Sequence, residues 1–183
     1  MTAGGEGMEG MERIKRASRR LVWTFNFVLI LTPIAVVLFW TQVGQQPSLA
    51  RYLPVTLDEN LPTWSRMLGL AVSLVPTSIL MYATMQLSKL FRLYERGDIF
   101  ARDNVRQYRS LGWSLIALGI AKFLNHTALS IVLTIHRPAG QRMLSIGINS
   151  DDVFLALIGM VVLTISWVMD EARKIEEEQS LII

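Results

Sequence analysis

Residues 21–43 read LVWTFNFVLILTPIAVVLFWTQV, an apolar stretch without a charged side chain. A helix of roughly 20 such residues crosses a hydrocarbon core of about 30 Å. The stretch is about twice as long as the apolar region of a signal peptide, and no clear small-x-small cleavage site follows it. Residues 21–43 therefore predict an uncleaved transmembrane helix, with Trp23 and Trp40 near its two ends, where indole rings favour the membrane interface.

Three more apolar blocks follow, residues 66–87, 111–135 and 153–169, and the last, at 17 residues, lies near the lower length limit for a span. Hydrophobic residues make up 51% of the 183-residue chain and charged residues 18%. The gathering of the apolar residues in four blocks argues against a soluble globule and a disordered chain. The chain is predicted to be all-α, a four-helix transmembrane bundle. In the second block, Gly69 and Ser73 form a pair of small residues that permits close helix contact.

The polar segments outside the blocks predict the domain organisation and the orientation. Residues 1–20 form a basic, mobile N-terminal arm, residues 21–169 the four-span membrane domain, and residues 170–183 an acidic tail. The arm, the connection 88–110 and the tail carry five, six and two basic residues, whereas the other two connections carry two each. Because basic residues stay on the cytoplasmic side, we expect both termini in the cytoplasm.

The connection between the second and third blocks is predicted to be mostly helical. Apolar residues continue at helical spacing beyond residue 87, so the second helix extends into the cytoplasm, and the third begins before its apolar block. Gly97 is expected to end the second helix as a left-handed cap. Helices two and three would then meet at a tight cytoplasmic corner set by Gly97 and Phe100.

Several classes of chemistry have no residues to support them. Cysteine is absent, which excludes disulfides and thiolate metal sites, and the chain has two histidines. His126 and His136 lie about 15 Å apart along a helix, too far to share one metal ion. The sequence contains no phosphate-binding glycine loop, no nucleophile elbow and no zinc-protease motif. We therefore expect no enzyme, no catalytic residues, no cofactor, no metal and no direct contact with nucleic acid.

The third block contains the candidate polar intramembrane site. Lys122, Asn125 and His126 are three and four positions apart, which puts them on one helix face. Lys122 lies roughly 16 Å into the span, where a charge costs about 3 kcal/mol. One interpretation is an ion, proton or polar ligand site.

The other interpretation is a structural cluster that joins the third helix to neighbouring hydroxyls, namely those of Thr77, Ser78 and Thr164. The four apolar blocks contain no acidic residue. We expect the aspartates at the ends of the fourth block to be too shallow to reach Lys122; these are Asp151, Asp152 and Asp170. Lys122 would then lack a counter-ion, which argues against a proton relay.

The cytoplasmic corner is the second candidate site. Arg96, Asp98, Arg102 and Asp103 alternate in sign there. They predict either surface ion pairing or a docking surface for a cytoplasmic partner. The acidic run Glu176–Glu178 is expected to pair with this basic corner in the same molecule, in preference to an external partner.

Two segments resemble a known family. Glu95–Phe100, read ERGDIF and followed by Asn104, Arg109 and the run Leu111–Trp113, resembles the inner corner of small bacterial membrane proteins catalogued as domain of unknown function 2975. The ending EEEQSLII (residues 176–183) resembles the acidic ending of that family. The resemblance implies a four-helix integral membrane protein without an established activity. Members often lie beside a small helix-turn-helix regulator, which suggests a signalling partnership.

These observations lead to a ranked set of functional hypotheses. The first is a non-enzymatic regulatory or sensory protein of the bacterial inner membrane, with a cytoplasmic docking surface for a regulator protein. The alternative is a small transporter or channel subunit that acts as a homo-oligomer, with Lys122, Asn125 and His126 along its route. A scaffold or assembly factor for a larger membrane complex is a third possibility.

Overall fold

The computed structural model consists of helices and connections. It describes residues 3–57, 61–98, 101–138 and 140–180; the side chains of residues 3–11, 47, 176, 179 and 180 lie outside this description. The helices are α1 (Ala3–Gln42), α2 (Pro47–Ala50), α3 (Thr63–Arg96), α4 (Arg102–Thr134) and α5 (Ser150–Ser180). Four of them, α1, α3, α4 and α5, are long and apolar enough to cross a membrane. The predicted all-α fold with four membrane-spanning helices is confirmed.

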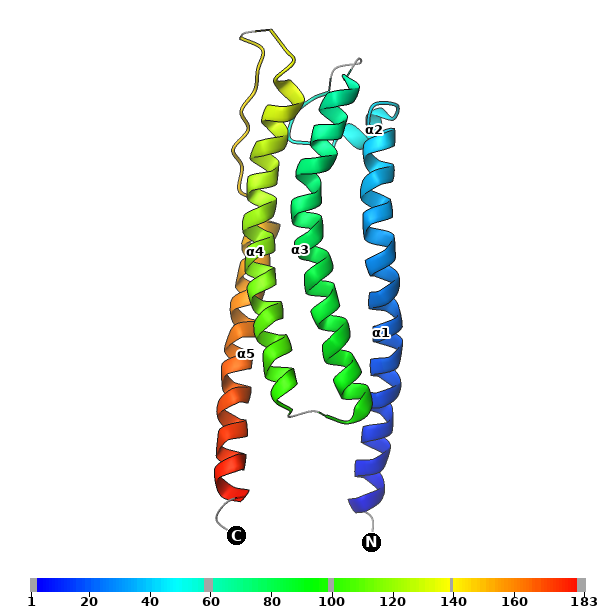
Figure 1. Cartoon of the computed structure of the whole chain (residues 1–183), viewed down its shortest axis with the longest axis vertical. Helices are drawn as coiled ribbons and strands as arrows, with labels where there is room; N and C mark the ends of the chain where they lie inside the picture. Colours follow the sequence, from blue (N-terminus) through cyan, green and yellow to red (C-terminus); the bar gives the residue numbers. More distant parts are fainter. Residues whose placement is uncertain (1–2, 58–60, 99–100, 139, 181–183) are drawn as a thin grey trace.

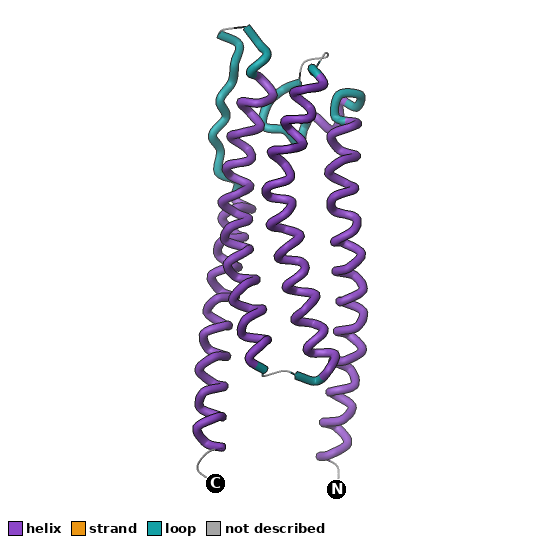
Figure 2. The backbone as a smooth tube through the Cα atoms, viewed as in Figure 1, coloured by secondary structure: helices purple, strands orange, loops and turns teal. Residues whose placement is uncertain are grey.

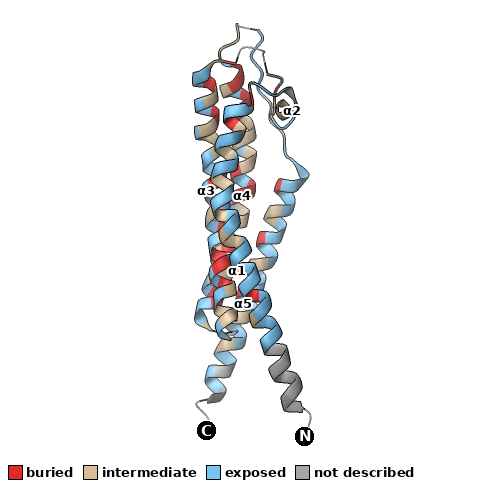
Figure 3. Cartoon of the chain, turned by 90° about the vertical axis from the view of Figure 1, so that its right-hand side faces the viewer, coloured by how far each residue is buried: buried red, intermediate tan, exposed pale blue. Residues whose placement is uncertain are grey.

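The four long helices pack in chain order, each against the next (Figure 1). Extensive interfaces join α1 to α3, α3 to α4 and α4 to α5, and within the described residues α1 and α5 share no such interface. Both termini lie at the same end of the molecule, which we call the terminal end (Figure 1). The opposite end, which carries α2 and the long connections, is called the loop end. Figure 3 shows α5 inclined to the other long helices.

The interface between α1 and α3 depends on small residues, as expected. The indole ring of Trp40 lies against Gly69, where a Cβ would collide with it, and its Nε1 donates a hydrogen bond to the Ser73 hydroxyl at 3.2 Å. The buried core at the loop end joins this interface to α4 through Trp40, Val43, Val55, Leu61, Leu129 and Leu133. Figure 3 shows that buried positions are few elsewhere on α1, so most of its apolar surface is available to lipid.

The helices extend beyond the predicted apolar blocks at the terminal end. α3 continues to Arg96 and α4 begins at Arg102, which confirms that the second and third spanning helices project past the apolar blocks. Gly97 follows α3 with φ 92°, the predicted left-handed cap, and the Asp98 N–H donates to the Leu93 carbonyl. α1 is helical from Ala3, so the predicted arm 1–20 is part of a helix from its third residue; its mobility stays a prediction.

The α4–α5 interface is built on glycines. A Cβ on Gly119 would lie 2.7 Å from the Asp152 carbonyl oxygen, and a Cβ on Gly112 would lie 2.9 Å from the Gly159 carbonyl oxygen. Because these positions carry no side chain, the two backbones approach closely. The Ser166 hydroxyl adds a hydrogen bond to the Val105 carbonyl at 3.2 Å.

The fourth crossing differs from the other three. α5 begins at Ser150, and the carbonyl of Asp152 lies against Gly119, near the middle of α4. The preceding residues 141–149 run as an extended chain beside the loop-end half of α4 (Figure 2). Hydroxyls of α4 bind this chain: the Ser145 N–H donates to Ser130 Oγ at 3.0 Å and the Met143 N–H to Thr134 Oγ1 at 3.2 Å.

Candidate functional site

Lys122 has a counter-ion. Its Nζ lies 2.9 Å from Oδ1 of Asp152, whose side chain is 4% exposed, whereas the Lys122 side chain is 41% exposed. Oδ1 of Asp152 makes no hydrogen bond within the described residues, so the contact with Lys122 is an ion pair. The expectations that Lys122 has no acidic partner and that Asp152 is too shallow are wrong, because residues 141–149 fold back along α4 and carry Asp152 to the level of Gly119.

The start of α5 positions the Asp152 carboxylate. The N–H groups of Asp152 and Val153 both donate to the Asn149 carbonyl, which closes the first turn. Asn149 Nδ2 lies 3.5 Å from Asp152 Oδ2, so the second oxygen also has a polar neighbour. A carboxylate in the first turn is further stabilised by the positive end of the helix dipole. Lys122 therefore pairs with a carboxylate that the N-terminus of α5 already stabilises.

His126 lies on the same side of α4 as Lys122. Its Nε2 is 3.2 Å from the Ser145 hydroxyl of the extended chain 141–149. Gly147 lies beside the ring, because a Cβ on that glycine would be 3.5 Å from Nε2. His126 thus helps to hold the extended chain, while Lys122 holds the helix that follows it.

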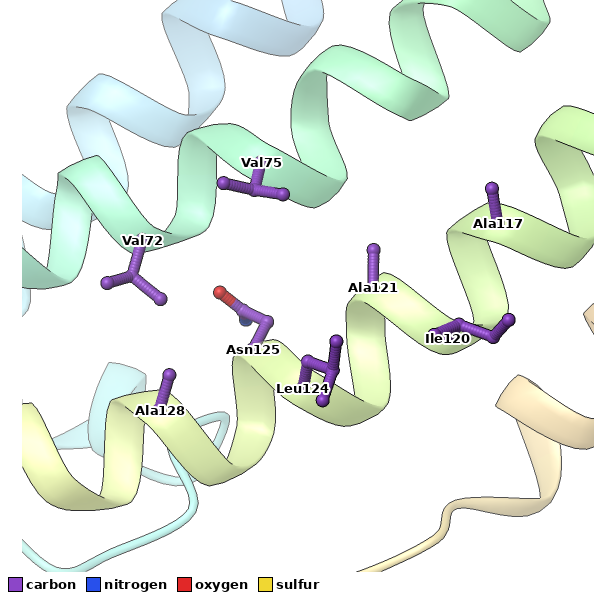
Figure 4. Close-up of a pocket in the computed structure, with 8 residues that line it drawn as sticks. All are labelled: Val72, Val75, Ala117, Ile120, Ala121, Leu124, Asn125 and Ala128. Carbon is purple, nitrogen blue, oxygen red and sulfur yellow. The ribbon is translucent and has the colours of Figure 1, made fainter.

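Asn125 is separated from the other two polar residues. It points into the space between α3 and α4, where it lines a pocket with Val72 and Val75 (Figure 4). The expected single polar face is therefore divided: Lys122 and His126 face α5 and residues 141–149, whereas Asn125 faces α3.

The structural interpretation named three hydroxyl partners on neighbouring helices, and those partners are wrong. Thr77, Ser78 and Thr164 donate to carbonyls of their own helices, those of Ser73, Val75 and Met160. The structural role fits the hydroxyls of α4 itself instead, since those bind the extended chain 141–149. Among the described residues, no group of three His, Cys, Asp or Glu side chains is placed to hold a metal ion.

The corner between α3 and α4 carries the second candidate site. Arg96, Asp98 and Asp103 are exposed, and Phe100 lies outside the described residues. Asn104 is buried beneath the corner and donates from Nδ2 to the Asp98 carbonyl at 2.6 Å. This hydrogen bond ties the first turn of α4 to the residue after Gly97.

The acidic tail contacts the corner within the same molecule. Nη2 of Arg102 donates to both carboxylate oxygens of Glu177, at 3.2 and 3.3 Å. Arg102, and after it Arg173, hold the pKa of Glu177 below its ordinary value by hydrogen bonding. Glu178 is exposed, and the side chain of Glu176 lies outside the described residues. For Glu177 the predicted pairing between tail and corner is therefore confirmed.

Sequence reasoning missed three polar contacts that join neighbouring helices near the terminal end. Arg19 Nε lies 2.8 Å from Glu95 Oε1 between α1 and α3. The hydroxyls of Tyr94 and Tyr108 are 2.6 Å apart between α3 and α4. Arg109 pairs with Asp170 at 3.9 Å between α4 and α5. The sequence shows the residue types of these pairs and that they lie at the same end of the molecule. Many other pairings of the charged and tyrosine side chains would be equally consistent with that information.

These features define an all-helical, multi-pass membrane protein with an ion pair between two of its candidate spans and a charged terminal end. Residues 52–183 match the profile of the family described as protein of unknown function (DUF2975). The chain belongs to this family, as the resemblance of its corner and tail implied. Searches of curated proteins and of solved structures found no match.

Proposed function

We propose that this chain is a non-enzymatic regulatory or sensory protein of the bacterial cytoplasmic membrane, in which α5 connects an intramembrane polar site to a cytoplasmic docking surface. The observation that carries the proposal is the continuity of α5. This one helix pairs with Lys122 through Asp152 in its first turn and with Arg102 through Glu177 near its other end. A change at either ion pair therefore acts on the same helix, α5.

The distribution of basic residues supports a cytoplasmic terminal end. The segments at that end carry most of the arginine and lysine of the chain, and such segments are retained in the cytoplasm. Both termini and the corner then face the same compartment (Figure 1). A cytoplasmic protein can reach all three.

The docking surface is the corner, with Arg96, Asp98, Arg102 and Asp103 as its charged contacts. Arg96, Asp98 and Asp103 are exposed, and within the described ranges their side chains make no ion pair. Arg102 is occupied by Glu177. A partner that presents a carboxylate of its own would compete with Glu177 for the Arg102 guanidinium, which makes the tail an intramolecular competitor.

The partner surface is tested by affinity capture in mild detergent with quantitative mass spectrometry. We expect a specific cytoplasmic protein to be lost when Arg96→Glu and Arg102→Glu are combined. It should be enriched with Glu177→Gln, which frees Arg102. Arg51→Glu, at the loop end, is the matched control and should leave recovery unchanged. Equal recovery with all four proteins would contradict the docking surface.

The connection through α5 is tested separately. The chain contains no cysteine, so the pair Arg102→Cys and Glu177→Cys can be introduced without background thiols. We expect Lys122→Met to change the rate at which this pair forms a disulfide by at least about threefold. Ile120→Val, on the same helix and away from Asp152, should leave the rate unchanged. An unchanged rate with Lys122→Met in a folded protein would refute transmission through α5.

The transporter hypothesis draws support from the same ion pair, because ionisable residues inside a membrane often mark ion pathways. A single chain offers only a succession of paired helices, so a pathway would need an oligomer. Proteoliposomes distinguish the two functions. We expect no proton or potassium flux from the wild type. Flux that Lys122→Leu abolishes would favour the transporter over the regulatory protein.

A further inference from the structure

A pocket of about 370 Å³ lies between α3 and α4 (Figure 4). Lys122 is not among its lining residues and pairs instead with Asp152 of α5. Its lining consists of Val72, Val75, Ala117, Ile120, Ala121, Leu124, Asn125 and Ala128. Three of these are alanines on α4, and their small side chains leave the space open. The volume falls in the range of pockets that bind small ligands.

The pocket has one polar side chain, and that side chain lacks a partner. Asn125 Oδ1 is buried and makes no hydrogen bond within the described residues. Figure 4 shows the amide of Asn125 directed across the pocket toward Val72 and Val75. A buried amide oxygen without a hydrogen-bond donor costs free energy, and lipid chains cannot supply that donor. The position therefore calls for a ligand with a hydrogen-bonding group.

We propose that this pocket binds a lipophilic alcohol, a molecule with an apolar chain and one hydroxyl. The hydroxyl lies at Asn125, and the chain extends beside Ala121 toward Ala117. A hydroxyl both donates and accepts, so it pairs with an amide in either orientation. This site is separate from the docking surface, and it stands whether or not the regulatory role does.

The lining excludes charged ligands. Its other seven residues are apolar, and no cation faces the pocket to neutralise a phosphate or a carboxylate. Lys122, on the same helix, is held by Asp152 instead. A plain hydrocarbon fits the apolar lining but leaves the Asn125 amide unpaired, so the hydroxyl is what distinguishes the ligand from a lipid chain.

The bilayer itself is the route of entry. Leu124 and Ile120, on the rim, are 57% and 56% exposed, and both belong to the predicted span 111–135. A ligand dissolved in the membrane reaches the pocket without crossing an aqueous phase. Its hydroxyl would arrive nearest the loop end, since Asn125 is nearer to that end of α4 than Ala117.

The test uses the whole protein in lipid nanodiscs and dodecan-1-ol that carries a photoreactive diazirine on its chain. We expect saturable labelling of α3 and α4 peptides that line the pocket, with competition by dodecan-1-ol and at least about tenfold weaker competition by dodecane. Asn125→Leu should lower the apparent affinity for the alcohol by about tenfold, the size expected for one hydrogen bond. Ala121→Phe should fill the pocket and abolish labelling there.

Two controls make the result decisive. Val161→Phe places the same added ring on an exposed face of α5 and should leave labelling unchanged. Asn125→Leu removes an unpaired amide, so the variant should unfold at or above the wild-type temperature without ligand. Equal competition by dodecane and dodecan-1-ol, or unchanged affinity with Asn125→Leu, would show that lipid chains alone fill the pocket and would overturn the proposal.

Discussion

Lys122 and Asp152 join the middle of α4 to the first turn of α5, with 2.9 Å between Nζ and Oδ1. The carboxylate is almost fully buried, while the ammonium group lies at the end of a half-exposed side chain. The pair fixes the start of α5 against α4, at the point where the chain changes from the extended segment 141–149 to a helix. Its energetic role follows from the asymmetry in burial.

Replacement of one partner should destabilise the protein more than replacement of both. Lys122→Met leaves the Asp152 carboxylate buried without a cation, and we expect the free energy of unfolding to fall by ~1–3 kcal/mol. This value is smaller than that for a fully buried pair because Lys122 is partly exposed. The double variant Lys122→Met with Asp152→Leu should recover most of this loss. A double-mutant cycle on thermal unfolding in detergent measures the coupling, and additive losses would contradict it.

Gly119→Ala should loosen the contact between α4 and α5. Its new Cβ would meet the Asp152 carbonyl oxygen at 2.7 Å, and backbone cannot give way as a side chain can. We expect a net loss of ~1–2 kcal/mol, since the helix propensity gained with alanine offsets part of the steric cost. Gly147→Ala is the matched control, because its new Cβ would lie 3.5 Å from His126 Nε2, which is an ordinary van der Waals contact. Equal unfolding temperatures for the two variants would refute the close approach.

The contact between Glu177 and Arg102 should depend on pH. The pKa of Glu177 is lower in the folded protein than its ordinary value of 4.5. Its stabilising contact is therefore fully present above about pH 4.5 and is lost as the pH falls through the lowered pKa.

Proteolysis of the tail, followed across this pH range, is the measurement. We expect faster cleavage at low pH in the wild type and pH-independent, fast cleavage in Glu177→Gln. Glu171→Gln, which alters a contact with Lys174 inside α5, should behave like the wild type. A tail that is cleaved at one rate in all three proteins would contradict the contact.

The hydroxyl of Ser130 should protect one particular amide. The Ser145 N–H donates to Ser130 Oγ, so Ser130→Ala leaves that N–H without its partner. We expect hydrogen exchange at Ser145 to become at least about tenfold faster, with little change at helical amides of α4. Thr164→Val is the control, because the Thr164 hydroxyl donates to a carbonyl of its own helix. Unchanged exchange in Ser130→Ala would show that the hydroxyl does not hold the extended chain.

The number and class of the spans could be predicted because hydropathy reports directly on which residues lipid can solvate. The blocks 21–43, 66–87 and 111–135 each lie almost entirely within a long helix of the structure. Gly97 was predictable for a related reason, since a glycine after the last helical residue is the usual left-handed cap.

The ion pair could not be predicted from block lengths. Hydropathy measures how long a segment is, and it does not report where the preceding connection places its start. A signal was nevertheless present in residues 144–148, read LSIGI, because apolar residues alternate with small ones at the period of an extended chain. Small residues at 145 and 147 lie against His126, as that alternation implies.

The separation of Asn125 from Lys122 has a similar cause. Spacing along a helix indicates which residues share a face, but adjacent faces of one helix can meet different neighbours. α4 packs on both α3 and α5, so a small angular difference decides between a pocket and an ion pair.

The succession of paired helices has a mechanical consequence. Among the described residues, α1 is extensively packed only against α3, and α5 only against α4. The stability of the helix assembly is therefore approximately a sum over three interfaces, as in a stack of repeats. Such a molecule is expected to unfold from its outermost helices, α1 and α5, inward. Damage to the α1–α3 interface should therefore spare the α4–α5 hairpin, because within the described residues α1 shares no extensive interface with either helix of that hairpin.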